Sequence, residues 1–243
     1  MPDKNALHEL EGLEPGRIIS YIEMCQHERV SLQRGMNFRL RDGVSVILMS
    51  RRPGAPYADL VEEDGRVLTY EGHDVPAQIG GPSPKTVDQP LTSSNGRPTQ
   101  NKLFYDAARS AAQSSQAPEL VRVYEKIKQG IWTYNGTFHL TDAWIAHPGR
   151  RKVFKFRLVL TEEAPPQTPT DLLVDLQHNR LIPSEVKLEV WKRDLGRCVI
   201  CGKQDNLHFD HDVPFSKGGS SLVVSNIRVL CARHNLAKHD RTE

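Results

Sequence analysis

The sequence lacks long apolar runs. No segment approaches the roughly 18 to 20 uninterrupted apolar residues that a membrane-spanning helix needs, and the N-terminus leads into a mixed polar stretch without the apolar region of a secretory signal. We therefore expect no membrane association and a cytoplasmic location. The 243 residues, 38% of them hydrophobic and 26% charged, suffice for one large domain or two small ones with a buried core.

The sequence also lacks a strong excess of charge of one sign. Its formal net charge is only +2, so bulk charge does not argue for a nucleic-acid partner. One local run is basic and comprises Arg150, Arg151, Lys152, Lys155 and Arg157. These side chains could contact phosphate groups, or they could form the solvated edge of a strand.

Cysteine is scarce, with four residues in the chain, and three of them lie in the C-terminal third. The fourth, Cys25, stands alone in an expected helix, and we interpret it as a small buried side chain. In a cytosolic protein, clustered cysteines indicate a metal site and not disulfides.

The clustered cysteines form two short ligand pairs, Cys198-x-x-Cys201 and Cys231-x-x-His234. Each pair can offer two ligands to one tetrahedral Zn²⁺. A unit of about sixty residues has little core, so a structural metal would stabilise it. The alternative is two unrelated pairs. His208 lies between the pairs, and we interpret it as a half-exposed strand residue and not as a ligand.

The first two thirds of the chain are predicted to form mostly β-strands. Apolar and β-branched segments bounded by turn residues predict strands at 44–49, 66–70, 121–124, 136–140 and 153–160. We expect a curved sheet or barrel with flanking helices. The fold class predicted for the whole chain is α+β, with a small zinc-bound module after the sheet.

Helical periodicity predicts a helix within residues 15–32 and another near 101–112. Ser184 can cap a third helix, which carries Val186, Val190 and Trp191 on one side. Residues 74–100 are rich in Pro, Gly, Ser and Thr and predict a long loop, and a Pro-rich polar stretch after residue 162 predicts a linker. The predicted organisation is a domain at 1–162, a linker at 163–182 and a second domain at 183–243.

Further polar residues lie between the two ligand pairs. They are Asp210-His211 before Val213-Pro214, a Gly-Gly turn at 218–219, and Asn226. Together with the second pair and Asn235 after it, this order resembles the HNH nuclease family over about residues 184–240. The resemblance implies a ββα-metal fold, a β-hairpin followed by a helix around a metal.

The HNH resemblance implies roles for individual residues. His211 is suited to take a proton from water, because imidazole titrates near neutral pH. Asp210 and Asn235 would hold a catalytic Mg²⁺ or Mn²⁺, which stabilises the leaving oxygen. Asn226 would orient the catalytic loop by hydrogen bonding. His239, one helical turn after Asn235, could share or take over its metal role. The alternative for the whole module is a zinc knuckle that only binds DNA.

A second ordered set of short segments lies at residues 36–160. It comprises Tyr57-Ala-Asp59, Gly65 to Gly72, Asp88-Gln89-Pro-Leu, Asn101-Lys-Leu, Val121-Arg-Val123, Tyr134-Asn-Gly136 and Lys155-Phe-Arg-Leu-Val-Leu. This order resembles the SRA or YDG domain, a reader of modified cytosine in DNA. The middle residue of the eponymous Tyr-Asp-Gly is Asn135 here.

The SRA resemblance implies a pocket for a flipped base. Tyr57 and Tyr70 would flank the ring, since stacking contributes about 1–3 kcal/mol per base. Asp59 would accept a hydrogen bond from the cytosine N4 amino group. The alternatives are that both tyrosines pack in the core or on a strand and that Asp59 is a turn residue.

The two resemblances together imply an endonuclease, prokaryotic and cytoplasmic, that depends on modified cytosine in double-stranded DNA. One HNH site cuts one strand at a time, so a double-strand break needs a dimer or two successive visits, and we expect a homodimer. One alternative is an HNH endonuclease that does not depend on modification. Another is a non-catalytic reader of modified DNA that carries a zinc module.

Overall fold

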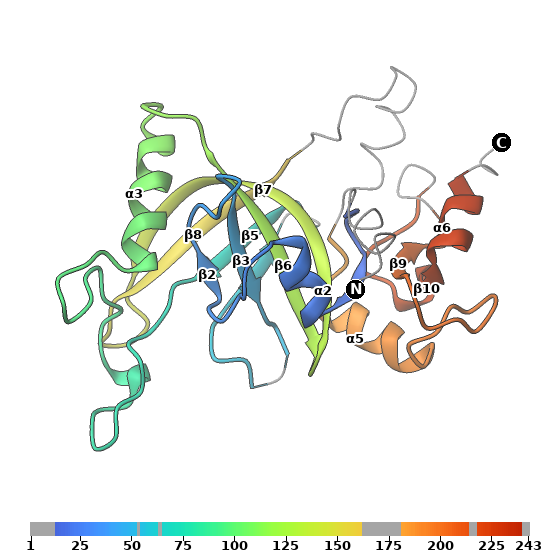
Figure 1. The fold of residues 1–243 in the computed structure, drawn as a ribbon, viewed down its shortest axis with the longest axis horizontal. Coiled ribbons are helices and arrows are strands. Elements are labelled where there is room, and N and C mark those ends of the chain that lie inside the picture. Colours follow the sequence, from blue (N-terminus) through green and yellow to red (C-terminus); the bar gives the residue numbers. More distant parts are fainter. Residues whose placement is uncertain (1–12, 53, 63–64, 162–180, 214–217, 240–243) are drawn as a thin grey trace, which may run out of the picture. The chain divides into compact units, whose positions relative to one another are not determined.

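The computed structural model describes residues 13–52, 54–62, 65–161, 181–213 and 218–239, with only the backbone of residue 239. A large sheet, a separate two-stranded sheet and helices make up this part of the chain, which confirms the α+β class (Figure 1). The expected Pro-rich linker lies almost wholly outside the described residues. Among the helices that are described, none combines the length and the apolar character needed to cross a membrane.

The large sheet has the strand order β2-β3-β6-β7-β8-β5-β4, and β1 pairs with β7. Apolar side chains alternate along β8, so one face of this strand is fully buried. A register shift between Leu140 and Asp142 marks an irregularity in β7, which curves strongly in Figure 1. The strands are β1 (Ile18–Ser20), β2 (Met36–Asn37), β3 (Ser45–Met49), β4 (Leu60–Glu62), β5 (Val67–Glu71), β6 (Glu119–Lys128), β7 (Ile131–Ala146) and β8 (Val153–Leu160).

Helix α3 (Gln100–Ala112) contacts β8 and β2. Thr99 begins it by accepting a hydrogen bond from the Lys102 backbone N–H through its side chain. Phe104 and Ala108 are fully buried on its inner face, and the Phe104 ring meets Phe156 edge-on at 6.1 Å. The predicted helix near 101–112 is confirmed. A short 3-10 turn, η2 (Pro84–Thr86), precedes it.

The prediction of a helix within residues 15–32 is wrong about where the helix begins. Residues 18–20 form strand β1, and helix α2 (Tyr21–His27) starts only after Ser20. The physical reason is a capping box, because the Ser20 and Glu23 side chains each bind the other residue's backbone N–H. Cys25 on this helix is partly exposed, so the expectation that it is a buried side chain is wrong.

The chain divides into two compact units that do not follow its order. The first, which we call the sheet unit, contains residues 32–123 and 137–161. The second, the C-terminal unit, contains residues 1–31, 124–136 and 162–243. Strands β6 and β7 each contribute residues to both units. The ranges 1–162, 163–182 and 183–243 remain a prediction about domain organisation.

The C-terminal unit contains a β-hairpin with a helix on either side in sequence. Helix α5 (Ser184–Arg193) precedes strands β9 (Leu207–His211) and β10 (Ile227–Cys231), and α6 (Ala232–His239) follows them. A 3-10 turn, η4 (Val224–Asn226), leads into β10. The expected cap Ser184 is the first helical residue, since Pro183 occupies the cap position without a side-chain hydrogen bond.

The N-terminal segment is part of this unit. The Gly16 backbone N–H donates to the Tyr134 carbonyl at 2.8 Å, and the Phe209 N–H donates to the Gly16 carbonyl at 3.1 Å. Gly16 has φ +88°, and a Cβ there would lie 2.9 Å from the Phe209 carbonyl oxygen, so this close approach requires glycine. Residues from β1, α5 and the hairpin share one core, which includes Ile18, Val190 and Val229.

A buried ion pair also holds the C-terminal unit together. The Lys187 ammonium donates to Glu125 Oε2 at 2.8 Å and to Asn135 Oδ1 at 2.6 Å, and Asn135 Nδ2 donates to Glu125 Oε2 at 3.1 Å. All three residues are at most 3% exposed. Burial alone would raise the pKa of Glu125, but Lys187 and the hydrogen bonds lower it below its ordinary value. An amide at position 135 can serve both partners, because it accepts from the lysine and donates to the glutamate.

We predict that Lys187→Met destabilises the protein by about 3–5 kcal/mol, because it leaves the Glu125 carboxylate buried without a counterion. Urea unfolding of the full chain measures the change. The matched control is the double variant Lys187→Met with Glu125→Gln, which has no buried charge and should recover most of the loss. An unchanged midpoint for the single variant would contradict the assignment.

Candidate functional site

Four side chains gather at one end of the β9–β10 hairpin. The sulfur atoms of Cys198, Cys201 and Cys231 and a ring nitrogen of His234 all lie within 4.8 Å of one another. His234 Nδ1 is 3.4 Å from both Cys198 Sγ and Cys231 Sγ, and the Cys201 and Cys231 sulfur atoms are 3.8 Å apart. The two sequence pairs therefore form one cluster, and the alternative of unrelated pairs is wrong.

The donor set of this cluster fits Zn²⁺, which takes three thiolates and one imidazole in closed structural sites. Burial alone would raise the pKa of the Cys198 thiol, but backbone N–H groups of Cys231, Cys201 and Ile200 and the His234 ring lower it to about 6. A thiolate is the form that binds metal. His208 is outside the cluster and is buried, not half-exposed as expected, because β9 is covered on both faces.

Asp210 and His211 are neighbours at the end of β9. Successive side chains on a strand point to opposite faces, so the two groups have different partners. The Asp210 carboxylate accepts a hydrogen bond from the Lys238 ammonium of α6 at 2.6 Å. His211 Nε2 lies 2.7 Å from the hydroxyl of Ser221, which is itself 5% exposed. Sequence reasoning missed Lys238 and Ser221, because neither motif nor spacing links them to β9.

Asn226 braces the loop between β9 and β10. Its Oδ1 accepts from the Val213 N–H at 2.8 Å, and its Nδ2 donates to the carbonyls of Val213 at 3.0 Å and Ser220 at 3.1 Å. Gly219 has to be glycine, since a Cβ there would lie 1.7 Å from the Val213 carbonyl oxygen. These contacts hold the chain on both sides of residues 214–217, which lie outside the described part.

Asn235 lies on α6, the helix that contacts both β9 and β10. It is 8% exposed, and its Oδ1 is buried without a hydrogen-bond partner among the described residues. A buried, unpaired amide oxygen close in sequence to the lysine that binds Asp210 suits a hard cation, which prefers carboxylate and amide oxygens. The side chain of His239 lies outside the described part of the structure, so its role stays a prediction.

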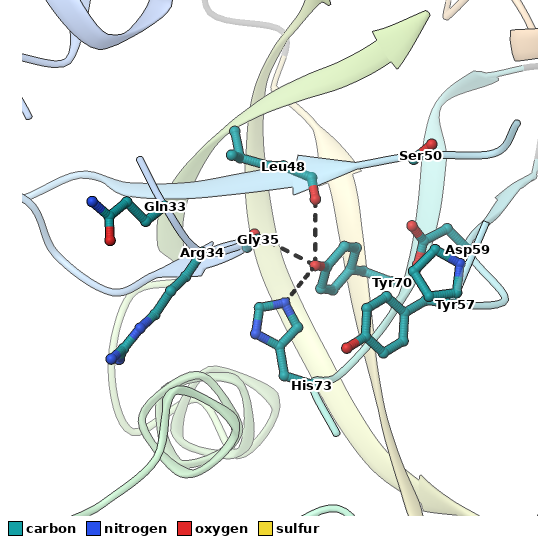
Figure 2. A pocket seen from close by; sticks show the side chains of 10 residues that line it. Gln33, Arg34, Gly35, Leu48, Ser50, Tyr57, Asp59, Tyr70 and His73 are labelled. Atoms are coloured by element: carbon teal, nitrogen blue, oxygen red, sulfur yellow. Dashed lines mark hydrogen bonds between the residues drawn. The ribbon is translucent and has the colours of Figure 1, made fainter. Parts of the chain in front are cut away.

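A second candidate site is a cavity of about 350 Å³ in the sheet unit (Figure 2). Tyr57, Asp59 and Tyr70, the three residues expected to bind a base, all line it. The other lining residues are Gln33, Arg34, Gly35, Leu48, Ser50, Pro56 and His73. The structure thus brings together all three predicted pocket residues from β5 and the segment before β4.

The aromatic residues of this cavity are held differently from one another. Tyr70 is 1% exposed, and its hydroxyl lies 3.1 Å from His73 Nε2, with the Gly35 and Leu48 carbonyls at 3.4 and 3.5 Å (Figure 2). Tyr57 is partly exposed, and its ring stacks on His73 with centroids 5.6 Å apart. Sequence reasoning missed His73, although it follows Tyr70 by three residues.

Buried ion pairs involve Glu71 and Asp74, the chain neighbours of the cavity residues Tyr70 and His73. Arg151 pairs with Glu71 at 3.2 Å and with Asp74 at 2.8 Å, and Lys155 pairs with Glu71 at 2.9 Å. These two members of the basic run 150–157 therefore face inward and do not offer charge to phosphate. Gln89 and Asn101 complete the support, since their side chains bind the backbone of residues 72–73.

Burial sets the protonation of two groups in the cavity. It raises the pKa of Asp59 to about 7, although backbone hydrogen bonds, including one from the Glu71 N–H at 3.0 Å, oppose the shift. It lowers the pKa of His73 to about 4, so the His73 ring is neutral near pH 7. Asp59 is consequently the group of this cavity that changes charge around neutral pH.

We predict one Zn²⁺ per chain, and we expect Cys231→Ala to lose it and to unfold the hairpin and α6, because ligation energy is folding energy. Elemental analysis and circular dichroism measure both effects. Cys25→Ala, outside the cluster, is the matched control and should keep its zinc. A folded, zinc-free Cys231→Ala protein with full activity would refute the assignment.

Comparison with solved structures finds proteins that are similar to a large part of this chain. The SRA of SUVH5 bound to fully methylated CG DNA is 22% identical, with a TM-score of 0.44 over 65% of this chain and 96% of that chain. The same SRA with hemimethylated CG DNA gives 23% identity and a TM-score of 0.45 over 65% and 94%. SUVH6 of Arabidopsis thaliana in complex with SAM is 21% identical, with a TM-score of 0.39 over 72% of this chain and 28% of that chain.

No curated protein matches the chain. The family described as HNH endonuclease matches residues 198–241, a segment that contains the Cys3His cluster, Asp210, His211, Asn226 and Asn235. Over these residues the chain is therefore similar to the HNH endonuclease family.

Proposed function

We propose that this protein is a DNA endonuclease that depends on modified cytosine. The sheet unit would bind a flipped 5-methylcytosine or a related base, and the HNH module would hydrolyse a phosphodiester of the same DNA. The observation that carries the nuclease part is the arrangement around β9, with Asp210 and His211 at its end and Asn235 on the helix that packs against it.

The chemistry follows from what these side chains can do. His211 is the base that removes the proton from the attacking water, and Ser221 at its Nε2 holds the ring in place. Asp210 and Asn235 would hold Mg²⁺ or Mn²⁺, which supplies charge stabilisation for the leaving oxygen. Asn226 fixes the loop after His211 through three hydrogen bonds. One such module cuts one strand, so we also propose that two copies make a double-strand break.

The reader part rests on the gathering of Tyr57, Asp59 and Tyr70 around one cavity. Flipping a base costs a few kcal/mol, which stacking and hydrogen bonds in the cavity must offset. The 5.6 Å between the Tyr57 and His73 centroids is too short for a base between them, because two van der Waals contacts need about 7 Å. A base that stacks on Tyr57 therefore has to displace Lys85, whose ammonium lies over the Tyr57 ring at 4.2 Å from its centroid, or Tyr57 has to move on its segment before β4.

A single methyl group gives limited discrimination by itself. Burying it yields about 0.8 kcal/mol, which is roughly fourfold in affinity. The fit of the methylated ring among Tyr57, Asp59 and Tyr70, or the joint action of two marked sites, has to supply the rest.

We predict that the purified protein, with Mg²⁺ or Mn²⁺, cuts a plasmid that carries 5-methylcytosine and leaves the matched unmethylated plasmid intact. His211→Ala should lower the cleavage rate by about 10²–10⁴-fold, because general-base catalysis is lost. Its affinity for methylated DNA should not change. Gel assays of both plasmids, together with binding to a labelled duplex, measure these outcomes.

The matched control is His147→Ala, which replaces an exposed histidine of the sheet unit. Equal cutting of both plasmids would support an endonuclease that is independent of modification. Selective binding without any cutting would support a non-catalytic reader. Parental cleavage by His211→Ala would reject the assigned base.

We further predict that the affinity for methylated DNA rises about tenfold between pH 6 and pH 8. The ionised Asp59 carboxylate accepts from the cytosine amino group more strongly than the neutral acid does, and its pKa of about 7 means that ionisation occurs across this interval. His73, with a pKa of about 4, stays neutral throughout. Fluorescence anisotropy with a methylated duplex gives the profile.

Asp59→Asn is the matched control, because it keeps the shape of the side chain and removes the titration. Its affinity should be independent of pH over the same interval. A wild-type profile that runs parallel to that of Asp59→Asn would exclude Asp59 as the group that binds the amino donor.

A further inference from the structure

The Lys238–Asp210 contact places a cation of the protein itself at the HNH site. The Lys238 ammonium lies 2.6 Å from Asp210 Oδ2, with 20% and 10% of the two side chains exposed. Both residues belong to elements of the C-terminal unit that pack together, α6 and β9. The pair is therefore an organised part of the site and not a loose surface contact.

This pair changes the charge that an incoming metal ion meets. A carboxylate that already binds an ammonium presents no net charge, and a divalent ion has to compete with that ammonium for the Asp210 carboxylate. Asn235, one helical turn before Lys238, contributes a neutral oxygen without a partner among the described residues. In the absence of DNA, the site thus combines suitable oxygen ligands with a competing internal cation.

DNA phosphate groups offer the Lys238 ammonium an alternative partner to Asp210. Phosphate groups attract lysine, and a lysine on a flexible four-carbon stem can turn from Asp210 to a neighbouring phosphate. Asp210 would then present a full negative charge to the metal ion. Since coupling between two ligands is reciprocal, a metal ion at Asp210 would in turn strengthen the binding of DNA.

We propose that Lys238 is a positioning residue that makes divalent-metal binding depend on bound DNA. In free protein it occupies Asp210 and keeps metal affinity low, and on DNA it moves to phosphate and opens the site. The proposal rests on the proposed nuclease function. It adds a reason why the free enzyme would not carry an activated metal centre that cuts without a correctly placed phosphate.

The test measures Mn²⁺ affinity directly, without relying on cleavage. The full-length, zinc-loaded His211→Ala protein keeps DNA intact, and electron paramagnetic resonance of free Mn²⁺ gives the dissociation constant with and without a methylated duplex. Lys238→Met removes the charge and keeps most of the stem, and Lys238→Gln is the second variant. Lys238→Arg keeps the charge. Lys192→Met, at an exposed lysine of α5, is the matched control.

With Lys238 present, DNA should tighten Mn²⁺ binding by a factor within the usual 5- to 150-fold range for coupled sites. Lys238→Met and Lys238→Gln should bind Mn²⁺ more tightly than the parent without DNA and gain little when DNA is added. Lys238→Arg and Lys192→Met should behave as the parent does. Metal affinity of the neutral variants that equals or falls below the parental value without DNA would overturn the proposal.

The variant Asp210→Asn distinguishes a failure of the Lys238 proposal from a failure of the proposed nuclease function. If Mn²⁺ affinity depends on Asp210 but not on Lys238, the proposed coupling to DNA is wrong and the assignment of Asp210 as a metal ligand is supported. If Mn²⁺ binding does not require Asp210, both the coupling and the assigned catalytic metal site are wrong.

Discussion

The gathering of three cysteines and a histidine at the end of the β9–β10 hairpin is the constraint on which the HNH site depends. Cys198 precedes the hairpin, whereas Cys231 ends β10 and His234 lies in α6, so a shared metal ion would fix the helix against the strands. The position of Asn235 follows directly, because it is the next residue after His234. A change in the cluster would therefore displace the proposed metal ligand Asn235 as well as destabilise the unit.

Both candidate sites are built on charges removed from water, and each of these charges has a partner. Removing an ion from water costs several kcal/mol, so a lone buried charge would not persist. Next to Tyr70 of the cavity, Glu71 is paired with Arg151 and Lys155. In the C-terminal unit, Lys187 is paired with Glu125. These pairs orient backbone segments next to the sites, which hydrophobic packing alone would hold less specifically.

Sequence reasoning succeeded where the signal is local. Ligand spacing found the metal cluster, and alternation of apolar residues found β8 with its observed bounds, because both patterns depend on neighbours in the chain. It failed where partners are distant. Residues 18–20 form a strand because β7 pairs with them, and Arg151 turns inward because Glu71 and Asp74 are there. No local pattern records those partners.

The reactive groups of the HNH site also follow the rule that buried polar groups find partners. His211 has Ser221 at its Nε2, and Asp210 has Lys238. These contacts stabilise the fold, since an unpaired donor or acceptor would cost about 1–3 kcal/mol. In the proposed mechanism the Lys238 contact opposes metal binding, because Asp210 would have to exchange this internal partner for the metal ion, whereas the Ser221 contact orients the His211 ring. If Lys238 turns to phosphate as we propose, a polyanionic substrate would release Asp210 and leave the neutral Ser221 contact unaffected, so the two groups would respond differently to the arrival of DNA.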